Sequence, residues 1–287
     1  MATAISIKNV TKTFGSKHAL DNVSLNIPQG HIYGFLGPNG AGKTTLIRCL
    51  MDYIASDGVI TILGRNAHSE SAELKRSVGY LSSDMQLHPN WTTKIHIDFM
   101  ASIKGRGQAD ELIKTLNLDM KAKVRNLSSG NKQKLAIILA FLGSPKLLIM
   151  DEPTRGLDPL LQNQLYELLR RFAKAGGTVF LSSHNLGEVQ HLCDNVAVIR
   201  EGKIVAAEAM KDILQMRVHM VEATATTAFV AADLKLKDIE ILSSAGKSVT
   251  LKARGKIDPI IKALAKYDLV DVEVSHPNLE DVFMEYY

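Results

Sequence analysis

Residues Gly37-Pro38-Asn39-Gly40-Ala41-Gly42-Lys43-Thr44 fit the pattern G-x-x-x-x-G-K-[ST], which is typical of a loop that wraps phosphate groups. The apolar run at residues 31–36 indicates a buried strand before the loop, and residues 45–51 indicate the start of a helix after it. In that context the backbone N–H groups of the loop and the positive end of the helix attract phosphate. A glycine-rich turn without a ligand is the alternative, and the flanking strand and helix disfavour it.

The last two residues of this loop are expected to contact the phosphates and a metal ion. We expect Lys43 to reach the outer phosphates of a bound ligand and the Thr44 hydroxyl to hold Mg²⁺. We also expect the adjoining Thr45 to contact the bound ligand.

Composition limits the class of protein. The chain has 287 residues, enough for one large domain or two, and no apolar run approaches the roughly 18–20 residues needed to cross a membrane. Its N-terminus lacks the pattern of a signal peptide. Cys49 and Cys193 offer no disulfide framework or metal spacing, so we expect inert core thiols and a reducing cytoplasm. The net charge of +4 comes without a basic block, so nucleic acid is not an expected partner.

An aromatic residue, Phe14, lies between two stretches of alternating apolar residues, 5–10 and 20–27, that predict half-buried strands. A phenylalanine beside a strand is commonly part of the core. Its ring can equally serve as a platform on which a nucleobase stacks. Position alone leaves both interpretations open.

Residues from about 84 to 143 read as a helical insert in an otherwise α/β chain. Apolar residues at 95–103 predict a helix that is buried on much of its surface, and 110–118 predicts another helix. The segment Leu127-Ser128-Ser129-Gly130-Asn131 then begins an apolar helix, with Ser128 or Ser129 as a natural N-cap. A second phosphate-binding helix terminus is the other interpretation. From this segment alone, a simple capped helix is favoured.

Two further strand ends carry candidate catalytic residues. The apolar strand at residues 147–150 ends in Asp151 and Glu152, and beside a phosphate loop we expect Asp151 to bind Mg²⁺ and Glu152 to act as a general base. The alternative is two solvated loop carboxylates. His184 follows the strand at 178–183, where open α/β sheets bind their ligands.

The character of the chain changes near residue 218. Strands are predicted at 221–225, 249–253 and 270–274, and helices at 259–266 and 277–284. We therefore expect two domains, residues 1–217 and a small α+β domain of residues 218–287 that carries no chemical motif.

Together these motifs resemble the nucleotide-binding subunits of ATP-binding-cassette (ABC) transporters, over residues 3 to about 210. Residues 37–44 match the Walker A motif of that family, and 147–152 match Walker B. Residues 127–131 look like the LSGGQ signature, Gly156-Leu157-Asp158 like the D-loop, and His184 like the switch histidine. The resemblance implies an α/β P-loop NTPase cassette with an antiparallel β subdomain and the helical insert. It also implies that Phe14 stacks on adenine.

The resemblance further implies an ATPase that uses ATP and Mg²⁺ and works as a dimer. In this family, Walker A of one protomer and residues matching Ser128, Ser129 and Gly130 of the other enclose each ATP, and Asp158 falls in the dimer-contacting loop. The partners it implies are a second nucleotide-binding subunit and a multi-spanning permease, which holds the chain at the inner face of the cell membrane. The C-terminal segment 279–283 is similar to cassettes of the drug, antibiotic and peptide exporter type. Soluble family members acting on ribosomes or in DNA repair, and a non-hydrolysing nucleotide sensor, are the competing functions.

The sequence departs from the family pattern in two places. Ser129 and Asn131 replace a glycine and a glutamine of the signature, and both keep a small or hydrogen-bonding character. The family commonly has a glutamine where this chain has Ser83-Asp84, and Gln86 is displaced by three positions. Which of these three residues does the work of that glutamine stays open at this point.

Overall fold

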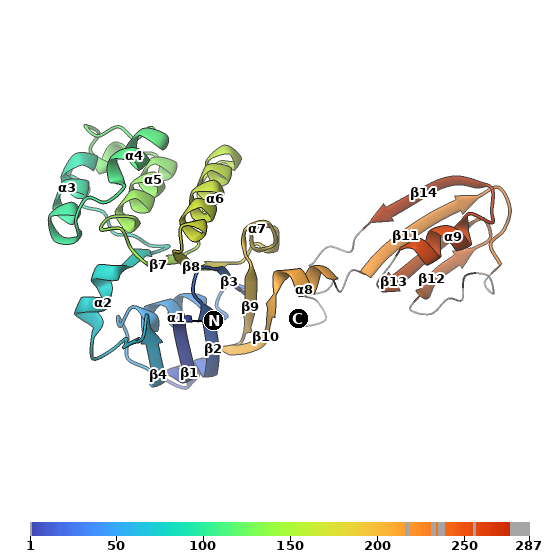
Figure 1. The fold of residues 1–287 in the computed structure, drawn as a ribbon, viewed down its shortest axis with the longest axis horizontal. Helices are drawn as coiled ribbons and strands as arrows, with labels where there is room; N and C mark the ends of the chain where they lie inside the picture. Colours follow the sequence, from blue (N-terminus) through green and yellow to red (C-terminus); the bar gives the residue numbers. More distant parts are fainter. Residues whose placement is uncertain (1, 216–217, 231–233, 235–238, 255–256, 276–287) are drawn as a thin grey trace. The chain divides into compact units, whose positions relative to one another are not determined.

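The computed structural model describes residues 2–215, 218–230, 234, 239–254 and 257–275 (Figure 1). The chain divides into two compact units, Met1–Glu208 and Ala209–Tyr287, and each is described by itself. None of the helices within the described residues combines the length and the apolar character that crossing a membrane requires.

A six-stranded sheet forms the centre of the first unit, in the order β10-β9-β3-β8-β7-β6 (Figure 1). The strands are β3 (Ile32–Leu36), β6 (Val78–Leu81), β7 (Leu147–Asp151), β8 (Thr178–Ser183), β9 (Asn195–Arg200) and β10 (Lys203–Ala209). Neighbours from β9 to β6 pair in parallel. Their carboxyl ends therefore meet at one edge, and the loops that follow β3, β6, β7 and β8 are brought together there.

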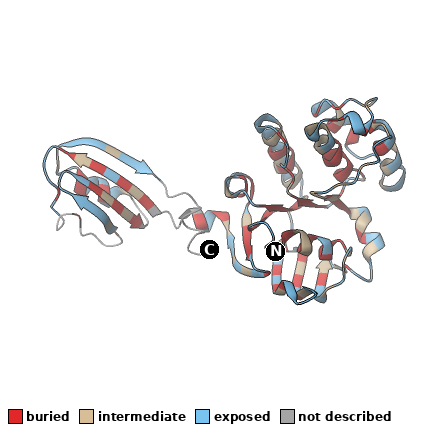
Figure 2. Cartoon of the chain, turned by 180° about the vertical axis from the view of Figure 1, so that it is seen from behind, coloured by how far each residue is buried: buried red, intermediate tan, exposed pale blue. Residues whose placement is uncertain are grey.

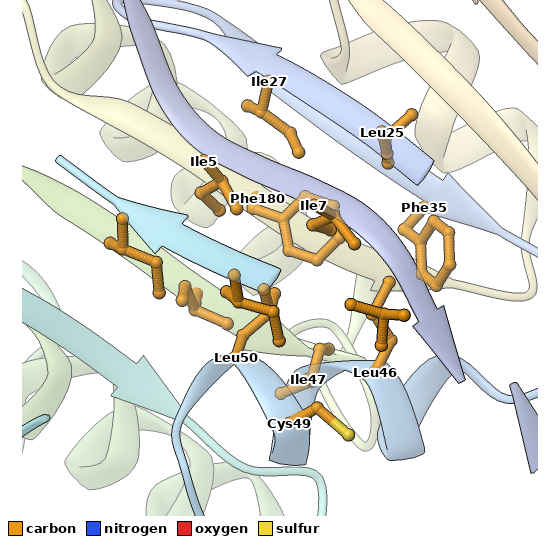
Figure 3. Close-up of a cluster of buried hydrophobic side chains, with 14 of the residues drawn as sticks. Ile5, Ile7, Leu25, Ile27, Phe35, Leu46, Ile47, Cys49, Leu50 and Phe180 are labelled. Atoms are coloured by element: carbon orange, nitrogen blue, oxygen red, sulfur yellow. The ribbon is translucent and has the colours of Figure 1, made fainter. Parts of the chain in front are cut away.

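A second, antiparallel sheet has the order β2-β1-β4-β5. Its strands are β1 (Thr3–Phe14), β2 (Lys17–Pro28), β4 (Asp57–Ile62) and β5 (Arg65–Asn66). Because alternate residues of a strand point to the same face, β1 buries Ile5 and Ile7 on the side of helix α1 (Lys43–Leu50). Figure 3 shows these side chains packed with Leu46, Ile47 and Phe180, so one core joins both sheets to the helix that follows the phosphate loop.

The helical insert contains α3 (Thr93–Lys104), α4 (Ala109–Thr115), the short 3₁₀ helix η1 (Val124–Asn126) and α5 (Ser129–Ala140). The prediction that the helix at 95–103 is buried on much of its surface was wrong. Ile95, Phe99 and Ile103 are 46 %, 50 % and 61 % exposed, whereas Ile97 is fully buried. A spacing of four residues places the three exposed side chains on one stripe of the helix, away from Ile97.

Helices α6 (Pro159–Lys174) and α7 (Leu186–Leu192) follow β7 and β8, and α2 (Ser71–Ser77) precedes β6. Leu165, Leu168 and Leu169 of α6 are buried and recur at helical spacing, which is a pattern that a sequence shows directly. The sequence did not predict α2 and α7, because seven residues cover only about two helical turns and show little periodicity.

In its described residues the second unit is an antiparallel sheet of order β12-β13-β11-β14 against which helix α9 packs, which confirms the expected α+β architecture. Its elements are α8 (Met210–Gln215), β11 (Val218–Ala225), β12 (Ile239–Ala245), β13 (Ser248–Arg254), α9 (Asp258–Leu264) and β14 (Leu269–Ser275). Alternate residues of β11 and β13 are buried, which appears as bands along the strands in Figure 2, and Ile260 and Leu264 of α9 join this core. The helix predicted at 277–284 lies outside the described residues.

Candidate functional site

The phosphate loop runs from the buried end of β3 to the first turn of α1. Gly42 caps the helix with a φ of 113°, and a side chain there would lie 2.5 Å from the Ala19 carbonyl oxygen. At Gly37 a side chain would lie 2.4 Å from the carbonyl oxygen of Ile199. Glycine is required at both positions because the loop packs directly on the backbone of neighbouring strands. Gly37, Ala41 and Gly42 are buried, and Pro38, Asn39 and Gly40 are exposed.

Lys43 folds back over this loop. It is only 6 % exposed, and its Nζ donates hydrogen bonds to the carbonyl oxygens of Gly37 (2.7 Å) and Pro38 (3.2 Å). The same Nζ lies 3.5 Å from Oε1 of Glu152. A buried ammonium is thus held by the loop beside the strand end that carries the two acidic residues.

Three hydroxyl groups converge on the carboxylate of Asp151, which is fully buried at the end of β7. Thr44 and Ser83 donate to Oδ2 at 2.9 Å and 2.7 Å, and Ser182 donates to Oδ1 at 2.5 Å. These groups come from α1, from the loop after β6 and from β8. An all-oxygen donor set around one carboxylate fits Mg²⁺, which takes hard oxygen ligands.

The loop after β6 brings Ser83, rather than Gln86, to Asp151. Ser83 reaches Asp151, whereas Nε2 of Gln86 donates to the Asp84 carboxylate at 3.3 Å. Sequence reasoning missed Ser182. Its position at the end of β8, in register with Asp151, is the signal that could have identified it.

Glu152 and His184 form a pair at the adjacent strand ends. His184 Nδ1 lies 2.6 Å from Oε2 of Glu152, and the two side chains are 58 % and 14 % exposed, respectively. The backbone of Glu152 has a φ of 52°, and its N–H donates to the Ser182 hydroxyl at 3.1 Å. A left-handed backbone at a residue other than glycine costs on the order of 1–3 kcal/mol and is concentrated at functional sites. Here it accompanies a carboxylate that meets both Lys43 and His184.

A pocket of about 580 Å³ collects these groups. Its lining consists of Phe14, Lys17, Ala19, Asn39, Gly40, Gly42, Lys43, Thr44, Thr45, Ser83, Glu152, Arg155 and His184. Phe14 is 52 % exposed with the Lys12 ammonium 5.2 Å from its ring centroid, so it is not a core residue. Lys17 and Arg155 were not predicted from the sequence. No local motif marks either cation.

The pocket lining does not include Ser128, Ser129, Gly130 or Asp158. Ser128 caps α5 and accepts a hydrogen bond from the Asn131 N–H at 3.3 Å, which confirms the predicted N-cap. Asp158 caps α6, accepting from the Leu161 N–H at 2.9 Å. A side chain at Gly130 would lie 3.7 Å from the Gly156 carbonyl oxygen, so the two segments adjoin each other.

Comparison with known proteins places these features in a family context. Residues 20–155 match the model of the ABC transporter family. An ABC transporter ATP-binding protein of Bacillus subtilis (strain 168), YcbN, is 33 % identical and aligns over 99 % of this chain and 97 % of its own length. The bacitracin transport ATP-binding protein BcrA of Bacillus licheniformis is 39 % identical over 71 % of this chain and 69 % of its own.

Solved structures agree with the sequence matches. An ATP-binding subunit of an ABC transporter superposes with a TM-score of 0.69 at 27 % identity, covering 74 % of this chain and 92 % of that chain. A dimeric bacterial ABC transporter cassette superposes with a TM-score of 0.67 at 26 % identity, covering 72 % and 98 %.

Proposed function

The chain belongs to the ATP-binding proteins of ABC transporters, and on this premise we propose that two copies close around ATP to power export by a separate membrane-spanning partner. The activity is ATP hydrolysis. The observation that carries the proposal is the pocket lined by the phosphate loop, Glu152 and His184, two of whose lining residues, Thr44 and Ser83, donate hydrogen bonds to the buried Asp151.

Within this pocket the residues divide the work of hydrolysis. Lys43 and the N–H groups of the loop bind the outer phosphates, and Phe14 offers its exposed ring to the base. Asp151, Thr44 and Ser83 are the residues that would hold Mg²⁺, which offsets the charge of the phosphates when bound. Glu152 takes the proton of the attacking water as general base. His184 holds that carboxylate through the contact at 2.6 Å and orients it.

The signature segment supports a site shared between two chains. Ser128 and Ser129 are exposed at the start of the twelve-residue helix α5, where backbone N–H groups attract phosphate. They do not line the pocket of their own chain, so a second copy has to supply them to an ATP bound on the phosphate loop. The exposed turn before the Asp158 cap adjoins this segment and belongs to the same proposed contact.

An apolar groove on the surface supports the proposal of a membrane-spanning partner. Met85, Gln86 and Leu87 share a hollow of about 450 Å³ with Tyr53, Tyr80, Trp91, Phe99 and seven further residues. The exposed stripe of α3 extends this groove with apolar surface, and contiguous exposed apolar patches mark interaction sites. We propose that the permease docks here, at the inner face of the membrane. Ser83 lies two residues from Met85, so the loop that holds Asp151 also lines the proposed docking groove.

Two variants that are each expected to be inactive in ATP hydrolysis, and to complement each other when mixed, test the shared site. Lys43→Ala removes the phosphate contact of one half-site, and Ser129→Arg blocks the other half without disturbing the core, because Ser129 is exposed. Each variant alone is expected to lose ATP hydrolysis. An equal mixture is expected to regain it, because mixed dimers contain one intact site. A mixture as inactive as its components would contradict the proposal, and hydrolysis by monomeric Ser129→Arg would do so too.

A further inference from the structure

A buried carboxyl group outside the pocket lies behind His184. Glu188 of α7 is 4 % exposed, and its Oε2 accepts a hydrogen bond from the Ser183 hydroxyl at 2.5 Å. Its other oxygen, Oε1, is enclosed and has no hydrogen-bond partner among the residues that the structure describes. A buried charge is costly unless all its lone pairs find partners, so this arrangement suits a neutral carboxyl better than a carboxylate.

Ser183 connects this carboxyl to the reaction site. Its backbone carbonyl accepts the N–H of Gly37 in the phosphate loop at 3.3 Å, and the next residue in the chain is His184. Its hydroxyl accepts the N–H of Asn185 at 2.9 Å and lies 3.3 Å from the Asn185 carbonyl oxygen. The turn that carries His184 is therefore fixed at one side by the phosphate loop and at the other by Glu188.

The hydroxyl geometry accommodates a proton on Glu188. With the proton on Oε2, the carboxyl donates to the Ser183 oxygen, and the Ser183 hydroxyl donates to the Asn185 carbonyl. A serine hydroxyl can accept two hydrogen bonds while it donates one, so the Ser183 hydroxyl, the Asn185 N–H and the Asn185 carbonyl all keep their partners.

The surroundings favour the neutral form as well. Burial raises the pKa of Glu188, more than the nearby hydroxyls of Ser183 and Thr154 lower it. The charged groups that face it are Glu152, which raises its pKa further, and His184, which lowers it. Two weak acids face it from α6 and from the end of α7. They are Tyr166 and Cys193, whose own pKa values the carboxyl of Glu188 helps to raise.

We propose that Glu188 is a positioning residue for ATP hydrolysis, which as a neutral carboxyl holds the Ser183–Asn185 turn so that His184 meets Glu152. The inference rests on the function proposed above. Glu188 does not touch the substrate. It acts through Ser183, and its neutrality keeps a second negative charge away from the general base.

Three variants separate positioning from mere folding. Glu188→Gln copies the neutral carboxyl, so the turn should still hold His184 in position. This variant is expected to keep kcat within about twofold of the wild type at pH 7. Glu188→Ala releases the turn and is expected to lower kcat by on the order of tenfold, with KM for ATP unchanged. Ser183→Ala breaks the same link. Combined with Glu188→Ala it should lower kcat by less than the product of the two single effects, because both substitutions remove the same Glu188–Ser183 hydrogen bond.

The pH profile gives a second readout. A raised pKa means that Glu188 is neutral below it and ionises as the pH rises through it, so wild-type kcat should fall on the alkaline side. Glu188→Gln should lack that fall. Glu167→Gln, on the exposed face of α6, is the matched control and should keep the wild-type profile.

The inference is overturned if Glu188→Ala, with wild-type ATP binding and melting temperature, also keeps wild-type kcat. It is equally overturned if Glu188→Gln is as slow as Glu188→Ala, because the charged form would then be the one required. An inactive wild type would instead count against the proposed function, so the two failures are distinguishable.

Discussion

Substituting Glu152 by glutamine tests the general base directly. The change removes one negative charge and one proton-accepting oxygen from a carboxylate that lies 2.6 Å from His184 and 3.5 Å from Lys43. Glutamine keeps the size of the side chain. Lys43 retains its two bonds to carbonyl oxygens of the loop, so the phosphate cradle stays in place.

The expected magnitude follows from the role of the carboxylate. A positioned general base contributes about 10²- to 10⁴-fold to a rate, which corresponds to about 2.7–5.4 kcal/mol of barrier height. ATP binding should persist or tighten, because the lost negative charge no longer repels the phosphates. ATP that is bound but not hydrolysed should keep two copies together.

Phosphate release and size-exclusion chromatography with and without ATP measure these effects. The Glu152→Gln variant should show slow turnover and an ATP-dependent dimer, and Glu167→Gln should behave as the wild type. Turnover within tenfold of the wild type would refute the assignment of Glu152 as the base. Slow turnover together with lost ATP binding would instead show that Glu152 supports the loop.

Three further substitutions examine single contacts of the site. Ser83→Ala removes one hydrogen bond to Asp151, a net loss of about 0.5–1.5 kcal/mol, so Mn²⁺ titrated into the nucleotide complex should bind about two- to tenfold more weakly; unchanged Mn²⁺ affinity would exclude a ligand role. Phe14→Ala should weaken ATP binding by roughly tenfold without changing kcat at saturation, whereas Phe14→Trp should retain it; an unaltered KM would mean that the ring does not stack. Lys43→Ala removes a charged donor, so calorimetry should show ATP affinity reduced by about tenfold or more; wild-type affinity would contradict the cradle.

The sequence predicted local structure correctly where that structure depends on residues a few positions apart in the chain. The strand, loop and helix around residues 37–44 were confirmed, as was the N-cap at Ser128. Both depend on backbone geometry within a few positions, which residue types such as glycine and serine control directly. The strand ends at Asp151 and His184 followed from the same kind of signal.

The solvent exposure of apolar side chains could not be predicted from such local patterns. The apolar residues of α3 predicted a buried helix, and the structure leaves Ile95, Phe99 and Ile103 on its surface. The position of Phe14 left core and pocket equally open, and the structure exposes half of its side chain. Hydrophobicity indicates that a residue can be buried, but only the neighbouring elements decide whether anything covers it.

The sequence by itself predicted phosphate binding at residues 37–44 and placed Asp151, Glu152 and His184 at the ends of strands. Only the tertiary structure decided which hydroxyls reach Asp151, that Ser83 rather than Gln86 contacts this carboxylate, and that Glu188 is buried and bonded to the residue before His184. The physical reason is separation along the chain. Thr44, Ser83 and Ser182 lie far apart in sequence, and a parallel sheet brings them to one carboxylate through the register of its strands, which no local pattern encodes.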